Sequence, residues 1–305
     1  MMEYKNIQAI LFSFLTAVVL AGGRCNPCMA ETIFESHWEN ATNGITREIR
    51  YSYTIQNTKP VVLNHAEVFL YAPVKESICQ RCLRVEVSSP AKLIVDEEGN
   101  QILHFSFDAI PPYGALVLTI KASVFFDSSG LRDRKNPSMK CTKAGPGIEC
   151  DAPEIQRLAL ELHDATPDKT ARKANDWISR RINDVGYISR SRGALYALRY
   201  QKGDCTEQAS LFVALCRANG IPARMAGGYF CPANMILSPS SFHNWAEFYD
   251  GEGWCLADPS KNAISQQGHD YIAMNVGSPD EGRNPIGIDR RHRVIGDGLT
   301  IRMEN

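Results

Sequence analysis

The 305-residue sequence lacks an excess of charge of either sign, because 33 lysines and arginines face 34 aspartates and glutamates. A dedicated nucleic-acid-binding protein needs a basic surplus to displace the counterions of its ligand, so this balance argues against that class. The sequence also has no internal repeat and no low-complexity tract. Its length allows a leader and two modest domains, with a composition ordinary for a soluble globular protein.

A hydrophobic run long enough to cross a membrane is missing too. The N-terminus has a short polar start with Lys5, and an apolar run follows from Ala9 to Gly23. A membrane span needs about 20 apolar residues, whereas the shorter run suits the central part of a secretory signal peptide. We therefore predict a cleaved signal peptide over residues 1–30 and a periplasmic or secreted protein with no stable membrane span. Small residues that suit a cleavage site stand at Ala21-Gly22-Gly23 and at Cys28-Met29-Ala30.

The N-terminus has two other interpretations. A retained membrane anchor stays open as the less favoured alternative, since only the length of the apolar run argues against it. A lipoprotein acylated at Cys25 is discounted, because Arg24 stands immediately before it, where such a signal needs a small residue.

Export changes the interpretation of the 10 cysteines. In an oxidising compartment, close cysteine pairs are more often disulfides than metal ligands. The alternative is a zinc site with Cys79 and Cys82 as one half and Cys141 and Cys150 as the other. The second pair has the wrong spacing for a zinc ribbon. We therefore predict disulfides, without assigning their pairing, and no metal site. Removal of the leader leaves Cys79, Cys82, Cys141, Cys150, Cys205, Cys216, Cys231 and Cys255.

Residues 31–126 have the pattern of short strands separated by turns. Short β-rich runs at regular spacing, with Gly and Pro between them, predict a β-sandwich. We expect a packing or substrate-presenting role for this region, and residues 127–150 have the composition of a linker. The predicted strands cover residues 48–55, 68–71, 83–87, 93–95, 101–107 and 116–126.

Helical periodicity replaces the strand pattern after the linker. We expect a first helix from Pro153 to His163. Thr166-Pro167 is a cap and first-turn signal, so a second helix is expected from there to Ile182. At the C-terminal end, residues 293–295 and 299–303 flank Gly296-Asp297-Gly298 and predict a hairpin.

A helix that begins at a cysteine is the most informative element. Asp204 is a natural N-cap, Glu207 completes a capping-box pattern, and Gly220 marks the end. A thiol in the first turn lies at the positive end of the helix dipole, which favours the nucleophilic thiolate. Cys205 is therefore a candidate nucleophile, although a buried structural cysteine is the common alternative. Cys216, among apolar neighbours in the middle of the same helix, fits that structural role.

A histidine and a carboxylate follow in two strand-like runs joined by Asp250-Gly251. This dipeptide predicts a two-residue hairpin turn closed by Tyr249 and Glu252. That register places His243 directly opposite Asp258 on one face, where the carboxylate can orient the imidazole. Each residue alone fits a structural role, but together they complete a nucleophile, a base and an orienting group.

These segments together resemble the transglutaminase-like superfamily, which is related to papain-like cysteine proteases. The resemblance covers roughly residues 170 to 260, and the β-rich region before it is similar, more loosely, to N-terminal domains of bacterial members. The implied fold is α+β, with an N-terminal β-sandwich and a catalytic domain over residues 151–305, whose helix carrying Cys205 packs on an antiparallel sheet. The matching motifs are Gly203-Asp204-Cys205-Thr206-Glu207, Gly228-Tyr229, His243-Asn244-Trp245-Ala246-Glu247 and Gly253-Trp254-Cys255-Leu256-Ala257-Asp258-Pro259.

The resemblance implies a catalytic triad of Cys205, His243 and Asp258. It also suggests Tyr187 as a side chain completing the oxyanion hole, and Trp245 and Trp254 as walls of the site.

The implied reaction is acyl transfer from a peptide or side-chain amide through a thioester, with hydrolysis favoured over crosslinking. No cofactor is needed for this chemistry, and the sequence shows no acidic calcium-binding loop. A basic stretch before Cys205 suits either acidic substrates or a solvated surface, the second being favoured. It consists of Arg180, Arg181, Arg190, Arg192, Arg199 and Lys202.

Three other classes of protein are alternatives to a cysteine acyl-transfer enzyme. A non-catalytic binding or scaffold module of the cell envelope is the main one, and the intact set of three residues argues against it. An arylamine N-acetyltransferase fits poorly with a signal peptide. A thiol oxidoreductase built on Cys79 and Cys82 lacks the surrounding βαβ pattern. The oligomeric state is left open.

Overall fold

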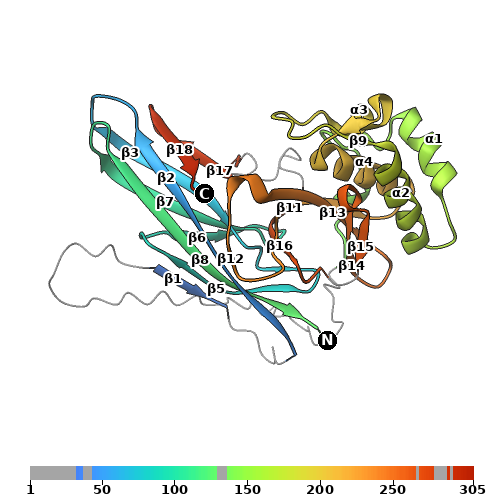
Figure 1. Cartoon of the computed structure of the whole chain (residues 1–305), viewed down its shortest axis with the longest axis horizontal. Helices are drawn as coiled ribbons and strands as arrows, with labels where there is room; N and C mark the ends of the chain where they lie inside the picture. The colour runs from blue at the N-terminus through green and yellow to red at the C-terminus, as the bar shows by residue number, and fades with distance from the viewer. Residues whose placement is uncertain (1–31, 37–42, 129–135, 266–267, 278–286, 289–290) are drawn as a thin grey trace, which may run out of the picture.

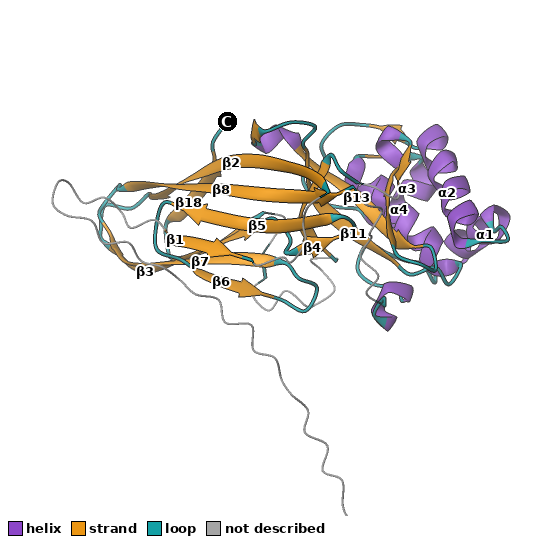
Figure 2. Cartoon of the chain, turned by 90° about the horizontal axis from the view of Figure 1, so that it is seen from below, coloured by secondary structure: helices purple, strands orange, loops and turns teal. Residues whose placement is uncertain are grey.

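The computed structural model describes residues 32–36, 43–128, 136–265, 268–277, 287–288 and 291–305. The predicted signal peptide and its anchor alternative lie outside these residues. Within them, no helix has both the length and the apolar character that a membrane crossing requires. The helices gather at one end of the molecule and a β-sandwich forms the other, with a five-stranded sheet between them (Figure 1). The view from below shows the same separation (Figure 2).

Two facing sheets form the β-sandwich that the strand pattern predicts. The first sheet contains seven strands: β1 (Thr32–Glu35), β2 (Gly44–Asn57), β4 (Glu76–Ser77), β5 (Gln80–Val87), β8 (Ala115–Asp127), β12 (Met235–Ile236) and β18 (Leu299–Met303). The second contains four: β3 (Leu63–Ala72), β6 (Lys92–Val95), β7 (Gln101–Ile110) and β17 (His292–Ile295). All six predicted strand segments are confirmed, because each lies within one of these strands.

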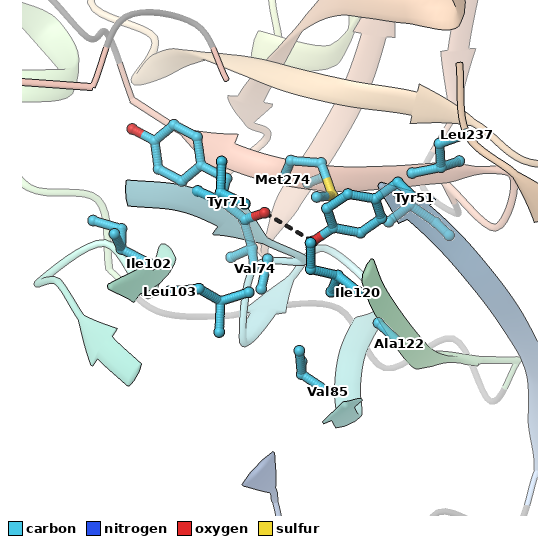
Figure 3. Close-up of a cluster of buried hydrophobic side chains, with 14 of the residues drawn as sticks. Tyr51, Tyr71, Val74, Val85, Ile102, Leu103, Ile120, Ala122, Leu237 and Met274 are labelled. Atoms are coloured by element: carbon cyan, nitrogen blue, oxygen red, sulfur yellow. Dashed lines mark hydrogen bonds between the residues drawn. The ribbon is translucent and has the colours of Figure 1, made fainter. Parts of the chain in front are cut away.

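The core of the sandwich continues beneath the neighbouring sheet. Ile102 and Leu103 of β7 pack with Ile120 of β8, and Met274 belongs to the same buried cluster (Figure 3). One polar group inside this core is satisfied locally, since the Tyr51 hydroxyl donates to the Tyr71 carbonyl at 2.8 Å. A shared core of this kind couples the sandwich to the sheet beside it.

The C-terminal strands do not form the predicted hairpin. β17 pairs antiparallel with β3, whereas β18 pairs antiparallel with β2, so the two strands belong to opposite sheets of the sandwich. The intervening turn crosses from one sheet to the other, with positive φ at Gly296 and Gly298 (150° and 86°). The chain therefore leaves the sandwich after β8, rejoins it briefly at β12 and returns to it at its end.

The remaining elements form a helical layer on an antiparallel sheet. The helices are α1 (Pro153–Leu162), α2 (Pro167–Arg181), α3 (Gly193–Tyr200) and α4 (Cys205–Ala218). The sheet, in the order β15-β14-β13-β11-β16, consists of β15 (Ala263–Ser265), β14 (Trp254–Asp258), β13 (Phe242–Tyr249), β11 (Ala223–Phe230) and β16 (Tyr271–Val276). Short elements complete the chain: β9 (Asn183–Asp184), β10 (Lys202–Gly203), and the 3-10 turns η1 (Met139–Thr142), η2 (Pro239–Ser241) and η3 (Pro259–Lys261).

This sheet is buried on both faces. Successive side chains of a strand point to opposite faces. Ala246 and Phe248 of β13 accordingly join the core under the helices, whereas Trp245 joins the core of the sandwich. The predicted packing of the cysteine-bearing helix on an antiparallel sheet is confirmed, because α4 buries its side chains against β11 and β13.

A buried ion pair joins the sheet to the sandwich. Arg224 of β11 donates from Nε to Glu247 Oε2 of β13 at 2.8 Å, and the Ser77 hydroxyl of β4 donates to Glu247 Oε1 at 2.8 Å. The Arg224 guanidinium also lies 4.0 Å from the centre of the Trp254 ring. Both carboxylate oxygens are therefore engaged inside the protein.

We expect Glu247→Gln to lower the free energy of unfolding by about 3 kcal/mol, because the Arg224 charge then stays buried without a counter-charge. Urea denaturation followed by circular dichroism measures the change. The matched control is Glu252→Gln in the exposed turn of the same hairpin, for which we expect less than about 0.5 kcal/mol. Equal effects of the two substitutions would contradict the structural role of the pair.

Candidate active site

The helix α4 begins at Cys205, as the sequence predicts. The Asp204 carboxylate accepts a hydrogen bond from the Thr206 N–H at 2.7 Å, and Glu207 accepts one from the Asp204 N–H at 3.1 Å. These two reciprocal bonds form the capping box and fix where the helix starts. The Cys205 side chain is consequently held in the first turn, at the positive end of the helix dipole.

The same two carboxylates hold the loop that carries Tyr187. Asp204 accepts from the Ile188 N–H at 2.8 Å, and Glu207 accepts from the Arg192 N–H at 2.9 Å. Burial raises the pKa of the Glu207 carboxyl, while the two backbone N–H groups that it accepts oppose the rise. The capping box therefore positions both the thiol and the loop facing it.

The strands β13 and β14 meet in a register different from the predicted one. Tyr249 lies opposite Trp254, so a four-residue loop replaces the predicted two-residue turn. The cause is the Asp250 side chain, which accepts hydrogen bonds from the N–H groups of Glu252 and Gly253 at 2.9 and 3.0 Å. Such an aspartate-centred turn lengthens the loop and shifts the pairing by two residues.

His243 and Asp258 nevertheless meet. A shift of two residues keeps every side chain on its original face, whereas a shift of one would move it to the other. The two residues lie on the same face as diagonal neighbours, and His243 Nε2 is 2.7 Å from Asp258 Oδ2. The prediction of direct opposition is wrong, but the contact it was meant to explain is present.

The Asp258 carboxylate is fully buried and accepts three hydrogen bonds. Besides His243, the Ser260 hydroxyl donates to Oδ1 at 2.7 Å and the Tyr271 hydroxyl to Oδ2 at 2.8 Å. Burial alone would raise the pKa of Asp258, but the hydrogen bond and charge of His243, helped by Ser260 and Tyr271, lower it below its usual range. The carboxylate is thus ionised at neutral pH.

The imidazole of His243 lies between Asp258 and Cys205. Burial would lower its pKa, but hydrogen bonds to Asp258 and then to Cys205 outweigh burial and raise the pKa of His243 to about 9. Since Nε2 is bonded to Asp258, Nδ1 is the nitrogen left for the thiol. The ring is therefore cationic at neutral pH.

A cleft of about 610 Å³ opens over Cys205 and His243. Tyr187, proposed from the sequence as an oxyanion-hole residue, lines this cleft with its side chain 78% exposed. The lining comprises Asp184, Gly186, Tyr187, Asp204, Cys205, Thr206, Pro239, Ser240, Phe242, His243, Asn244, Ser260 and Arg291.

The two tryptophans suggested as walls of the site do not line the cleft. Trp245 is buried behind His243, with ring centroids 6.3 Å apart at 28°, and it meets Tyr271 edge to face at 5.2 Å. Trp254 is farther back, between Arg224 and Tyr249. Trp245 therefore supports the imidazole from below, and Trp254 belongs to the packing of the hairpin.

Asn244 is a site residue that the sequence reasoning missed. Its Nδ2 donates to Thr206 Oγ1 at 3.1 Å and lies 3.9 Å from Cys205 Sγ. The neighbouring strand β11 leaves room for the Asn244 side chain because Gly227 lies opposite it. A Cβ atom added at Gly227 would lie 3.0 Å from Asn244 Oδ1 and crowd it. The signal available in the sequence was its place directly after His243. The sequence holds no such signal for Tyr271, because only folding brings this residue close to Asp258.

The eight described cysteines are all free thiols in this structure, so the predicted disulfides are not formed among them. Cys205 is partly exposed, and the other seven are buried. Cys216 is one of these, in the middle of α4, where burial raises the pKa of its thiol. In the described part of the chain, no group of three or more His, Cys, Asp or Glu side chains is arranged to hold a metal ion.

Comparison with known families agrees with this geometry. Residues 156–259 match the family model of the Transglutaminase-like superfamily. The matched segment contains Cys205, His243 and Asp258. No curated protein matches the sequence.

One solved structure shows the same fold at low sequence identity, and a second aligns less closely. A candidate cysteine protease from Cytophaga hutchinsonii aligns with a TM-score of 0.58 and 16% identity, over 89% of this chain and 92% of that one. The similarity thus includes the sandwich as well as the helical part. The periplasmic domain of TgpA from Pseudomonas aeruginosa aligns with a TM-score of 0.39 and 15% identity, over 70% of this chain and 90% of that one.

The raised pKa of His243 predicts a pH-dependent stability. The folded-state value of about 9 exceeds the unfolded value of 6.5. The stabilisation that the protonated His243 imidazole gives to the folded state is therefore fully present below pH 6.5 and is lost as the pH rises through about 9. Relative to His243→Gln, we expect the wild-type free energy of unfolding to fall over this window, by at most about 1.4 kcal/mol per pH unit.

Urea denaturation at a series of pH values measures this slope. His163→Gln, at an exposed histidine after α1, is the control and keeps the wild-type slope. A wild-type curve parallel to that of His243→Gln would show that the imidazole does not gain its partners on folding.

Proposed function

We propose that this protein is a cysteine acyl-transfer enzyme that cleaves peptide or side-chain amides, with Cys205, His243 and Asp258 as its triad. The observation that carries the proposal is the His243 imidazole, which lies 2.7 Å from the Asp258 carboxylate and lines the same cleft as the helix-start thiol of Cys205. Nucleophile, base and orienting carboxylate in this order suit covalent catalysis. The cleft above them has the size of a small-molecule or peptide site.

The reaction begins when the Cys205 thiolate attacks the amide carbonyl and a C–S bond forms. The negative charge that develops on the carbonyl oxygen is stabilised by the Cys205 backbone N–H and by Asn244 Nδ2. His243 then gives its proton to the leaving nitrogen as the C–N bond breaks, and a thioester remains. Water attacks the thioester and gives a proton to His243. The C–S bond then breaks, which releases the carboxylic acid and restores the Cys205 thiolate.

Hydrolysis is favoured over transfer to a second amine because the cleft is open to water. Tyr187 lines it while 78% exposed, and Ser240 and Ser260 contribute hydroxyl groups to its wall. Crosslinking needs water to be kept away from the thioester. We therefore propose a protein or peptide substrate with water as acceptor, acting outside the cytoplasm if the predicted signal peptide directs export.

Iodoacetamide labelling of the purified protein at several pH values, located by mass spectrometry, tests the triad. We expect selective labelling of Cys205 near neutral pH, because burial raises the pKa of Cys79, Cys82 and Cys231 to about 12. In His243→Ala the rate at neutral pH should fall about tenfold or more, since the cation that stabilises the thiolate is gone.

Cys205→Ser is the control that removes the labelled site, and a peptide substrate assayed with and without an added amine separates hydrolysis from transfer. Slow labelling spread over several cysteines and unchanged by His243→Ala would overturn the triad. It would favour instead a non-catalytic binding module.

Asn244→Ala tests the proposed oxyanion contact. We expect the rate of substrate acylation to fall about ten- to a hundredfold, because one hydrogen-bond donor to the developing charge is lost. Alkylation of Cys205 by iodoacetamide develops no oxyanion and should change less than threefold. Single-turnover acylation and alkylation rates, measured side by side with Asn244→Gln, provide the comparison. A parallel loss in both rates would show that Asn244 positions the thiol rather than the oxyanion.

A further inference from the structure

Arg291 reaches the cleft from outside the segment that matches the superfamily. It precedes β17, and its backbone carbonyl accepts a hydrogen bond from the Tyr71 N–H of β3 at 3.4 Å. Its side chain nevertheless lines the same cleft as Cys205 and His243. The sandwich therefore contributes a charged group to the site.

Among the residues that the structure describes, the partners that hold the guanidinium of Arg291 are uncharged. Nη1 donates to the Pro239 carbonyl at 3.1 Å, and the group lies 5.4 Å from the centre of the Phe242 ring. In the described part of the chain it takes part in no ion pair. A fixed arginine of this kind presents its remaining N–H groups to a ligand.

The other charged groups of the cleft do not compensate this cation. Asp184 accepts a hydrogen bond from the Gly186 N–H at 2.8 Å, and Asp204 accepts those from Thr206 and Ile188. Both carboxylates are thus turned to their own backbone.

The phenol groups near Arg291 carry no charge. Tyr53 and Tyr229 lie with it around a small internal cavity. Burial raises the pKa of Tyr229 to about 12 and that of Tyr53 higher still, so both phenols are neutral at pH 7. Neither phenol therefore places a negative charge beside the guanidinium.

We propose that Arg291 binds a carboxylate of the substrate, so that the enzyme prefers amides with a carboxylate close to the bond that is cleaved. This assignment rests on the proposed function, because it places the carboxylate beside the carbon that Cys205 attacks. Arg291 belongs to the cleft, whereas none of the six basic residues that precede Cys205 in the sequence lines it. The carboxylate comes either from an acidic side chain or from a free peptide C-terminus.

Alkylation of Cys205 by iodoacetate and by iodoacetamide tests the site without needing a substrate. The two reagents differ by one negative charge, so the ratio of their rates reports the attraction of an anion to the cleft. We expect Arg291→Gln to lower the iodoacetate-to-iodoacetamide ratio about fivefold, with the iodoacetamide rate unchanged. The His243 cation also attracts iodoacetate. Because both proteins contain His243, its effect on the rate ratio cancels when the wild type is compared with Arg291→Gln.

Two variants complete the alkylation experiment. Arg291→Lys keeps the charge and should retain most of the ratio. Arg302→Gln, at an exposed arginine of β18 that is paired with Glu304, should retain all of it. Sodium chloride at about 1 M should lower the wild-type ratio towards that of Arg291→Gln. An unchanged iodoacetamide rate and melting temperature show that Arg291→Gln is folded.

The outcomes separate the two proposals. Selective alkylation of Cys205 with the same ratio in wild type and Arg291→Gln overturns the carboxylate site alone. Failure of both reagents to label Cys205 selectively overturns the proposed function, and the carboxylate site with it.

Protection of Cys205 from iodoacetamide identifies the source of the carboxylate. Three matched peptides serve as competitors: one with a free C-terminus, one amidated, and one amidated with an internal glutamate. Protection by the first alone assigns a terminal carboxylate, and protection by the third assigns an acidic side chain. In either case Arg291→Gln should lose the protection, whereas equal protection by all three peptides overturns the preference.

Discussion

Burial of the five-stranded sheet on both faces is the constraint on which the other features of the molecule depend. The helices cover one face and fix α4 against β11 and β13, while the sandwich covers the other and encloses Trp245. Because both faces are closed off from bulk water except at the cleft, a charge on the buried part of these strands needs a partner inside the protein. Glu247 obtains one in Arg224, and Asp258 in His243. The low dielectric of the same environment strengthens the hydrogen bonds around Asp258.

The candidate site lies where this sheet and the start of α4 come together. The capping box fixes the thiol and the opposing loop at once, so the geometry of the nucleophile and the shape of the cleft are not independent. The sandwich contributes in two further ways, through the core behind Trp245 and through Arg291 at the rim. The site is therefore a product of the whole chain, although the superfamily match covers only residues 156–259.

Local signals in the sequence predicted six strands of the sandwich, the helices α1 and α2 and the start of α4, because a cap and a strand pattern depend on neighbouring residues. They also predicted that His243 and Asp258 would share a face, since the alternation along a strand survives an error of two residues in the register. They missed the contribution of Tyr271 to the site, which depends on contacts across the folded sheet. The positions of β17 and β18 were missed for the same reason, because Gly296-Asp297-Gly298 looks like a hairpin turn until the two sheets on either side are known.

The return of the chain to the sandwich has a consequence for how the protein folds. The Thr58 hydroxyl donates to the Gly298 carbonyl, a contact between residues 240 positions apart. Closing so long a loop is slow, and contacts of high sequence separation lower folding rates. During synthesis, β2 and β3 leave the ribosome long before β18 and β17 are available to pair with them. The strand edges that these last strands cover stay open for that time, when they are most exposed to pairing with another chain.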